Sequence, residues 1–134
     1  MTPKLLPLLV LVLAAPAAVA TAQQQPEWRQ SAEYDVLLRP FAYEPRVIRL
    51  DAGRPVRLRF VNSGQAPLTF RAPEFFRRSQ VRAGDADLVA AGSLSLAPGE
   101  RRTIVLVPQA GRYRVRSANL MHRLLGMSGE IVVE

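Results

Sequence analysis

Short apolar runs alternate with polar residues along most of the chain beyond residue 33. In the clearest run, Pro55–Val61, the alternation directs Val56, Leu58 and Phe60 to one side and the arginines between them to the other. Such runs recur about every ten residues and are separated by Gly, Pro and Asn turn signals. This spacing predicts an all-β sandwich of about 7–8 strands with one or two short helical turns.

The same pattern places every expected element in one folded domain, residues 34–134. Helical turns are expected over Pro73–Arg78 and Asn119–Leu125. The expected strands are Tyr34–Leu38, Arg46–Leu50, Pro55–Val61, Leu68–Arg71, Asp87–Ala90, Arg101–Val107, Arg112–Ser117 and Gly129–Val133.

Residues 1–22 have the pattern of a secretory signal peptide: Lys4, an apolar run from Leu5 to Ala15, and small residues ending at Ala22. The apolar run is shorter than the roughly 20 residues that span a bilayer. We therefore expect cleavage after Ala22, followed by a flexible lead-in over residues 23–33. Since no later segment is apolar enough to span a membrane, the protein is expected in a bacterial periplasm, without a transmembrane segment once the signal is removed.

Composition narrows the chemistry that the chain can carry. It has no cysteine and a single histidine, His122, which excludes disulfides, thiolate metal ligands and any multi-histidine site within one chain. It shows neither a glycine-rich phosphate loop nor a serine nucleophile motif that this histidine would serve. We therefore expect that the protein is not an enzyme.

Arginine dominates the predicted surface. The formal net charge is +7, and all but one of the 18 basic residues are arginine. A solvated sheet face is the simpler interpretation, and an electropositive face for an acidic partner protein or an anionic membrane is the alternative. A nucleic acid partner is not expected, because the protein would be exported and has no stretch of interleaved basic and aromatic residues. The arginines expected to face outward on strands are Arg57, Arg59, Arg112, Arg114 and Arg116.

Several segments together resemble the cupredoxin family, the Greek-key β-sandwich that houses type 1 copper. The resemblance is closest to the stand-alone cupredoxin-like domains of bacterial periplasmic metal-handling and iron-uptake systems. It covers about Tyr34 to Glu134 and rests on Phe41–Val56, Leu58–Gly64, Leu68–Phe76, Leu96–Glu100 and Gly111–Val133.

The resemblance implies four copper-ligand positions, and only two of them hold a ligand residue. Leu68 stands at the first histidine position and Ser117 at the cysteine position, whereas His122 and Met127 match the second histidine and the methionine. Because the blue colour and the electron transfer of a type 1 centre depend on a copper–thiolate bond, this chain is predicted to have lost that centre.

The remaining residues leave metal binding open. His122 and Met127, with Met121 nearby, would make a weak copper site, since thioethers favour Cu(I). Alternatively, the histidine is a surface or capping residue and the methionines fill the core. A site built from carboxylates is a third interpretation, although no spacing singles out Glu33, Asp35, Glu74, Asp85 or Asp87.

The loop between the last two strands would also form a contact surface. It carries Leu120, Arg123, Leu124 and Leu125, and Phe75 would join it if its ring is exposed rather than in the core. Two functions follow. The protein is a metal-handling protein of the cell envelope that binds copper weakly through His122 and Met127, or it is a metal-free interaction module. Such a module would dock a periplasmic or membrane partner through this loop and the arginine-rich surface.

Overall fold

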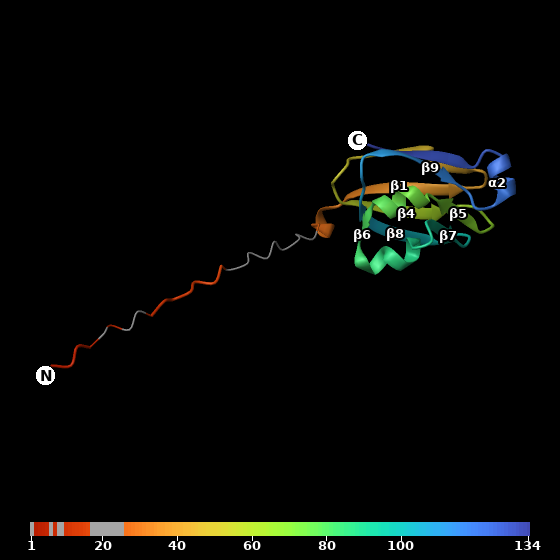
Figure 1. Ribbon diagram of the computed structural model, residues 1–134. Coiled ribbons are helices and arrows are strands. Elements are labelled where there is room, and N and C mark those ends of the chain that lie inside the picture. Colours follow the sequence, from red (N-terminus) through yellow and green to blue (C-terminus); the bar gives the residue numbers. More distant parts are fainter. Residues whose placement is uncertain (1, 6, 8–9, 17–25) are drawn as a thin grey trace.

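The computed structural model describes residues 2–5, 7, 10–16 and 26–134. Its folded domain is a sandwich of two five-stranded sheets, which confirms the predicted fold class (Figure 1). The first sheet has the order β2-β1-β4-β8-β6, formed by Ala42–Glu44, Ala32–Arg39, Val56–Asn62, Arg101–Val107 and Gln80–Val81. The second has the order β3-β10-β9-β5-β7, formed by Val47–Leu50, Ser128–Val133, Gly111–Arg116, Leu68–Arg71 and Ser93–Leu96.

Every second side chain of β4 points into the space between the sheets. Val56, Leu58 and Phe60 are buried, whereas Arg59 faces solvent, as the sequence pattern predicts. Phe60 of the first sheet meets Phe70 of the second with ring centroids 4.8 Å apart. The two sheets therefore share one continuous core, and the side chains on the opposite face of each strand point outward.

Two parallel pairings shape the sheets. β1 runs parallel to β4, from Ala32 opposite Val56 to Leu38 opposite Asn62. β10 runs parallel to β3 and antiparallel to β9, so it lies between them. β5 pairs with β9 at Arg71 opposite Arg116, and the chain then turns away into α1. The second sheet is therefore open beside the first half of β9.

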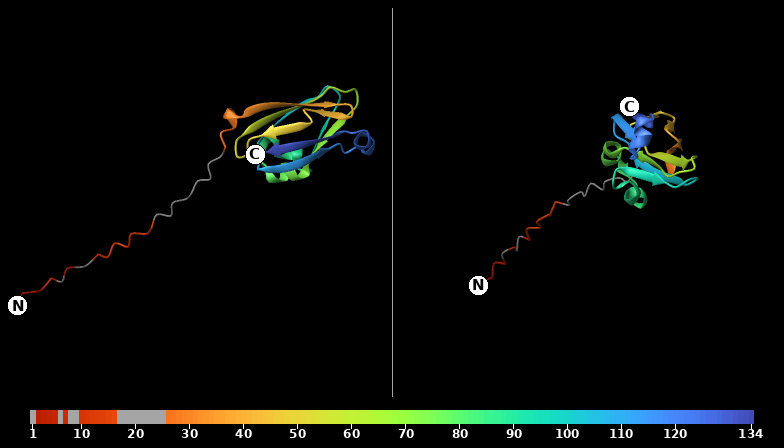
Figure 2. Two further views of the ribbon diagram at one scale, coloured as in Figure 1. Left: turned by 90° about the horizontal axis from the view of Figure 1, so that it is seen from above. Right: turned by 90° about the vertical axis from the view of Figure 1, so that its right-hand side faces the viewer.

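Short helices occupy the connections: η1 (Trp28–Gln30), α1 (Pro73–Arg78), η2 (Ala83–Val89) and α2 (Leu120–Leu124). α1 has the predicted bounds and starts with a proline, whose missing N–H is tolerated in the first helical turn. α2 lies at the end of the sandwich away from η1 and from the last residue (Figures 1 and 2). In the part of the chain that is described, no helix is long and apolar enough to cross a membrane.

One predicted strand, Asp87–Ala90, is wrong. Asp87–Val89 belongs to η2, and the strand that pairs with β5 is β7. Asp85 fixes η2 to the first sheet: its carboxylate accepts the Val105 N–H at 3.0 Å and pairs with Arg82 at 2.9 Å. Four residues of mixed polarity are too few for their periodicity to separate a strand from a helical turn. The short β2 and β6 were not predicted either.

The N-terminal predictions fall partly outside the described residues. Residues 2–5, 7 and 10–16 of the predicted signal peptide adopt no regular secondary structure, and cleavage after Ala22 lies outside the described part. Within the predicted lead-in, Trp28–Gln30 forms η1 and β1 already begins at Ala32. The strand starts before Tyr34 because its pairing with β4 extends to Ala32 opposite Val56.

Candidate functional site

The ligand loop, residues 117–127, joins β9 to β10 at the α2 end of the sandwich (Figure 1). Asn119 caps α2, because its side-chain carbonyl accepts the backbone N–H groups of Met121 at 2.9 Å and His122 at 3.4 Å. The loop closes where the Met127 N–H donates to the His122 carbonyl at 2.9 Å. These bonds form the predicted helical turn and place His122 and Met127 on one closed turn.

Ser117, at the expected cysteine position, is the centre of a small hydrogen-bond network. Its hydroxyl oxygen lies 3.4 Å from His122 Nδ1 and 3.2 Å from Thr69 Oγ1, and it accepts the Asn119 N–H at 3.2 Å. Thr69 Oγ1 also accepts the Ala118 N–H at 2.7 Å. The Ser117 side chain is 1% exposed, so this hydroxyl ties the ligand loop to β5 rather than facing solvent.

The residues present do not fit a type 1 copper ion. Leu68 and Met127 are buried, His122 is half-buried, and Leu68 and Ser117 supply an aliphatic group and a hydroxyl where an imidazole and a thiolate are needed. Among the described residues, no three His, Cys, Asp or Glu side chains gather into a metal site. Four of the five carboxylates of the third interpretation pair with arginines instead, namely Glu33, Asp35, Glu74 and Asp85; no ion pair of the described residues includes Asp87.

Two aromatic residues of the β1–β2 region support the site, and sequence reasoning gave neither a role. Phe41 has a backbone φ of 64°, which bulky residues rarely adopt, and its ring meets the His122 imidazole edge-on with centroids 5.5 Å apart. Tyr43 donates its hydroxyl proton to the Thr69 carbonyl at 2.5 Å. Burial raises the pKa of Tyr43 above its ordinary value, so the phenol stays a donor.

Apolar side chains cover the outside of the ligand loop. Leu120, Met121, Leu124 and Leu125 are 60%, 60%, 72% and 56% exposed, and no residue of α2 is buried. Phe41 is also exposed, and its contact with His122 of α2 places its ring next to these side chains. We call Phe41, Leu120, Met121, Leu124 and Leu125 the α2 patch. Arg123, also predicted for the contact surface, is exposed on the same helix.

Phe75 does not belong to the α2 patch, so the expectation that it is available to a partner is wrong. Its side chain is fully buried, with ring centroids 5.4 Å from Phe76 and 5.5 Å from Tyr113. α1 packs both of its phenylalanines into the core, and Phe76 also meets Phe70. Burial of this large aromatic ring stabilises the fold, so the ring is not available to a partner.

The model of the cupredoxin-like domain matches residues 7–133 of the chain. The protein therefore belongs to the family of cupredoxin-like domains, as the sequence resemblance implies. The comparison with curated proteins found no match.

Solved structures with the same fold have low sequence identity to this chain. Auracyanin from the photosynthetic bacterium Roseiflexus castenholzii is 18% identical, with a TM-score of 0.55 over 78% of this chain and 98% of that one. Auracyanin A from Chloroflexus aurantiacus, a "blue" copper protein, is 17% identical, with a TM-score of 0.51 over 77% and 100%. A multi-copper oxidase from Pseudomonas thermotolerans is 21% identical, with a TM-score of 0.60 over 78% of this chain and 29% of its own. At these identities the likeness shows the fold alone.

Proposed function

We propose that this protein is an exported, metal-free interaction module that docks a periplasmic or membrane protein through the α2 patch. The observation that carries the proposal is that α2 exposes Leu120, Met121 and Leu124 while burying none of its residues. Apart from His122, the residues of α2 gain little stability from tertiary packing, and a contiguous exposed apolar surface commonly marks an interaction site. The signal-peptide pattern of residues 1–22 supports a periplasmic setting.

The charges around the α2 patch define the partner's chemistry. Arg123 is exposed on α2 itself, and Arg71 and Arg116 are exposed where β5 and β9 approach the ligand loop. A complementary protein surface would offer an apolar centre with carboxylates at its rim, because polar rims and opposite charges favour specific association. This rim of positive charge supports a protein partner with an acidic border.

The test uses a photo-crosslinking residue at position 124, with position 110 as the matched control. Ala110 is exposed in the turn before β9, at the other end of that strand. In cells that produce the protein, we expect one protein to crosslink from position 124 and not from position 110. The purified partner should then bind the native protein at least roughly tenfold more tightly than Leu124→Asp, with Ala110→Asp unchanged.

Other outcomes would count against the proposal. A crosslink to a second copy, with concentration-dependent sedimentation, would make the α2 patch a self-association surface. Binding to phospholipid vesicles that Leu124→Asp abolishes would assign the α2 patch to the membrane. Because Leu124 is mostly exposed, its replacement by aspartate should leave the unfolding midpoint close to that of the native protein.

A second candidate function, weak Cu(I) binding, is favoured by the geometry of His122. Its Nδ1 points toward Ser117, and the bond from the Met127 N–H to the His122 carbonyl keeps both candidate ligands on one turn. An imidazole with one or two thioethers suits Cu(I), and Met121 is the exposed second thioether. The expectation that the protein is not an enzyme stays a prediction.

Competition of the protein with a Cu(I) chelator tests this second candidate. Stoichiometric binding that is lost in both His122→Ala and Met127→Leu, with Met121→Leu weaker, would support it. Leucine is chosen at position 127 because it conserves volume in the core. Binding that is indifferent to His122 and Met127 would remove this candidate.

A further inference from the structure

A groove lined by arginines lies beside the ligand loop, on the second sheet. It has a volume of about 660 Å³ and is bordered by β9, by the end of β5 and by the start of α1. One carboxylate lines it, Glu74, and this group pairs with Arg77. The arginines that line the groove are Arg71, Arg112, Arg114, Arg116 and Arg123.

The strand register concentrates positive charge in this groove. Arg71 and Arg116 stand directly opposite each other on β5 and β9. Side chains at such positions have Cβ atoms about 5 Å apart, and like charges there repel. Arg114 follows on the same face of β9, roughly 7 Å along the strand from Arg116. Three guanidinium groups can therefore reach one ligand.

None of these three arginines forms an ion pair with a described residue, and the one carboxylate in register with them, Glu130 opposite Arg114 on β10, pairs with Arg112 instead. Within the described part of the chain, no ion pair includes Arg71, Arg114 or Arg116, whereas Arg112 pairs with Glu130 at 3.3 Å. Repulsion at a strand-pairing position costs stability, and an anion between the guanidinium groups would relieve it. Uncompensated charge in a concave site also attracts anions more strongly than the same charge on a flat surface.

The shape of the groove favours a compact anion over an acidic peptide strand. Its volume lies within the ~300–1,000 Å³ typical of small-molecule sites. The open edge of β9 is partly occupied by α1, because Phe75 and Arg78 pack on Tyr113, with ring centroids 5.5 Å apart and the guanidinium carbon 5.6 Å from the ring centroid. A further strand would have to displace these contacts to pair with β9.

We propose that this groove binds a phosphate group, free or carried by an organic molecule or a lipid headgroup, through Arg71, Arg114 and Arg116. The planar guanidinium fork gives paired hydrogen bonds to phosphate oxygens, which a lysine ammonium does not. This binding activity goes beyond docking through the α2 patch: Arg71 and Arg116 also lie at the rim of that patch, but phosphate binding needs none of its apolar side chains.

Calorimetric titration with inorganic pyrophosphate, in about 0.15 M salt to screen diffuse attraction, tests the proposal. The double variant Arg114→Gln/Arg116→Gln should bind at least roughly tenfold more weakly than the native protein. The matched control is Arg57→Gln/Arg59→Gln, which removes the same charge at the same spacing from β4. The control should change the affinity less than about twofold, and both variants should keep the native circular dichroism spectrum.

Equal losses in the two double variants would overturn the proposal, because they would show attraction to overall charge alone. Arg116→Lys keeps the charge and should still weaken binding several-fold, and an unchanged affinity would count against the guanidinium geometry. Leu124→Asp should bind pyrophosphate normally, so that a failure of the docking function is distinguishable from a failure here.

Two further ligands separate the sources of the phosphate. If the protein binds vesicles containing phosphatidic acid but not pyrophosphate, and Arg114→Gln/Arg116→Gln abolishes the vesicle binding, the groove binds a lipid headgroup. Pyrophosphate binding without vesicle binding would assign it to a soluble phosphate compound. Absence of both, or tighter binding of an octaglutamate peptide than of either, would overturn the proposal.

Discussion

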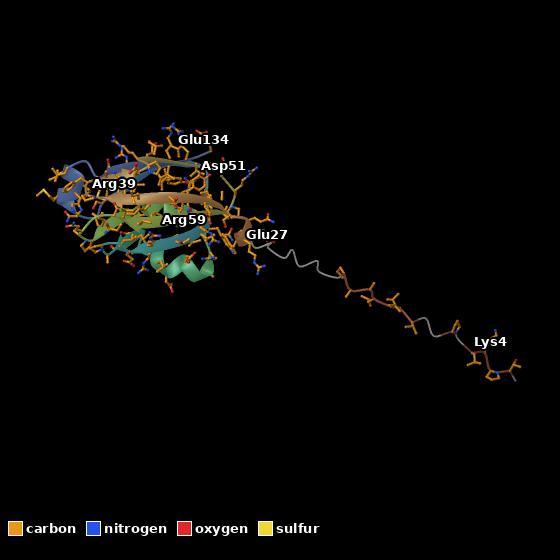
Figure 3. The ribbon with its side chains drawn as sticks, turned by 180° about the vertical axis from the view of Figure 1, so that it is seen from behind. Lys4, Glu27, Arg39, Asp51, Arg59 and Glu134 are labelled. Carbon is orange, nitrogen blue, oxygen red and sulfur yellow. The ribbon has the colours of Figure 1, made fainter. Side chains whose placement is uncertain are left out.

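Both sheets carry arginines at alternate positions of a strand, on β4 and on β9, but the residues opposite these arginines differ between the sheets. On the first sheet, Glu33 stands opposite Arg57 and Asp35 opposite Arg59 in the parallel register of β1 and β4. Arg59 binds Asp35 at 2.7 Å, and Arg57 lies 3.9 Å from Glu33. Figure 3 labels Arg59 on this face.

On the second sheet, the residue opposite Arg116 on β5 is another arginine, Arg71. The alternation of polar and apolar residues therefore predicts which face of a sheet an arginine is on. Whether its charge is neutralised depends on the residue opposite it on the neighbouring strand. The first sheet has a surface of matched charges, and the second has a surface that would gain from an outside anion.

Phe70→Ala gives the largest expected effect, because it removes the contact on which both faces depend. Phe70, on the second sheet, is fully buried and lies against two rings of the first sheet, Phe60 and Tyr43. We expect a loss of about 3–5 kcal/mol in the free energy of unfolding. Urea titrations followed by circular dichroism should show one transition, moved to lower urea.

The control for that variant is Phe41→Ala, since Phe41 is 43% exposed. A loss of less than about 1 kcal/mol is expected there. Similar losses in the two phenylalanine variants would contradict the idea that one shared core supports both arginine faces.

Arg59→Gln and Arg116→Gln should shift stability in opposite directions. Arg59→Gln removes exposed ion pairs to Asp35 and Glu33 and should lower stability slightly, because water screens such pairs. Arg116→Gln removes repulsion with Arg71 and should stabilise the protein by a similar small amount. Urea unfolding in low and high salt is the measurement, and salt should shrink both differences. A common sign for both variants in phosphate-free buffer would remove the contrast between the sheets.

The smallest expected effect is on the pH dependence of stability, and it concerns the paired charges of Glu100 and Arg102 beside the first sheet. Glu100 accepts the Ala97 N–H at 2.7 Å and the Arg102 Nε–H at 2.7 Å, and these bonds lower the pKa of its carboxyl below the ordinary value. Its contribution to stability is complete above the ordinary pKa and is lost as the pH falls through the lower folded value.

Carboxyl NMR titration should therefore place the Glu100 midpoint below that of an unstructured glutamate. Glu100→Gln should make unfolding slightly less sensitive to acid. An unchanged dependence of stability on pH in this variant would contradict a role for these two hydrogen bonds.

Much of the fold could be predicted because its strands alternate cleanly. β5, β8 and α1 have the predicted bounds, and the alternation of β4 and β9 correctly separates core from surface. The prediction failed between α1 and β8, where Asp85 holds the chain in η2 through a bond to Val105, twenty residues further along the sequence. Such contacts leave no periodic signal.

The candidate site could be predicted only where it lies on one segment. Ser117, His122 and Met127 share the ligand loop, so their spacing is visible in the sequence. The roles of Thr69 and Phe41 depend on contacts across the fold, to Ser117 and His122. The arginine groove likewise depends on the register that sets Arg71 against Arg116.

The position of β10 governs the order in which the molecule can form. Its residues, Ser128–Val133, are the last strand of the described chain, yet they lie between β3 and β9. A chain synthesised from its N-terminus cannot complete the second sheet until these residues have left the ribosome. Pairing of such distant segments is slow, because the loss of chain entropy precedes the gain in contacts. β3 precedes β10 by many residues, and until β10 pairs with it both of its edges are open to other chains; afterwards β3 is still the outer strand of the second sheet.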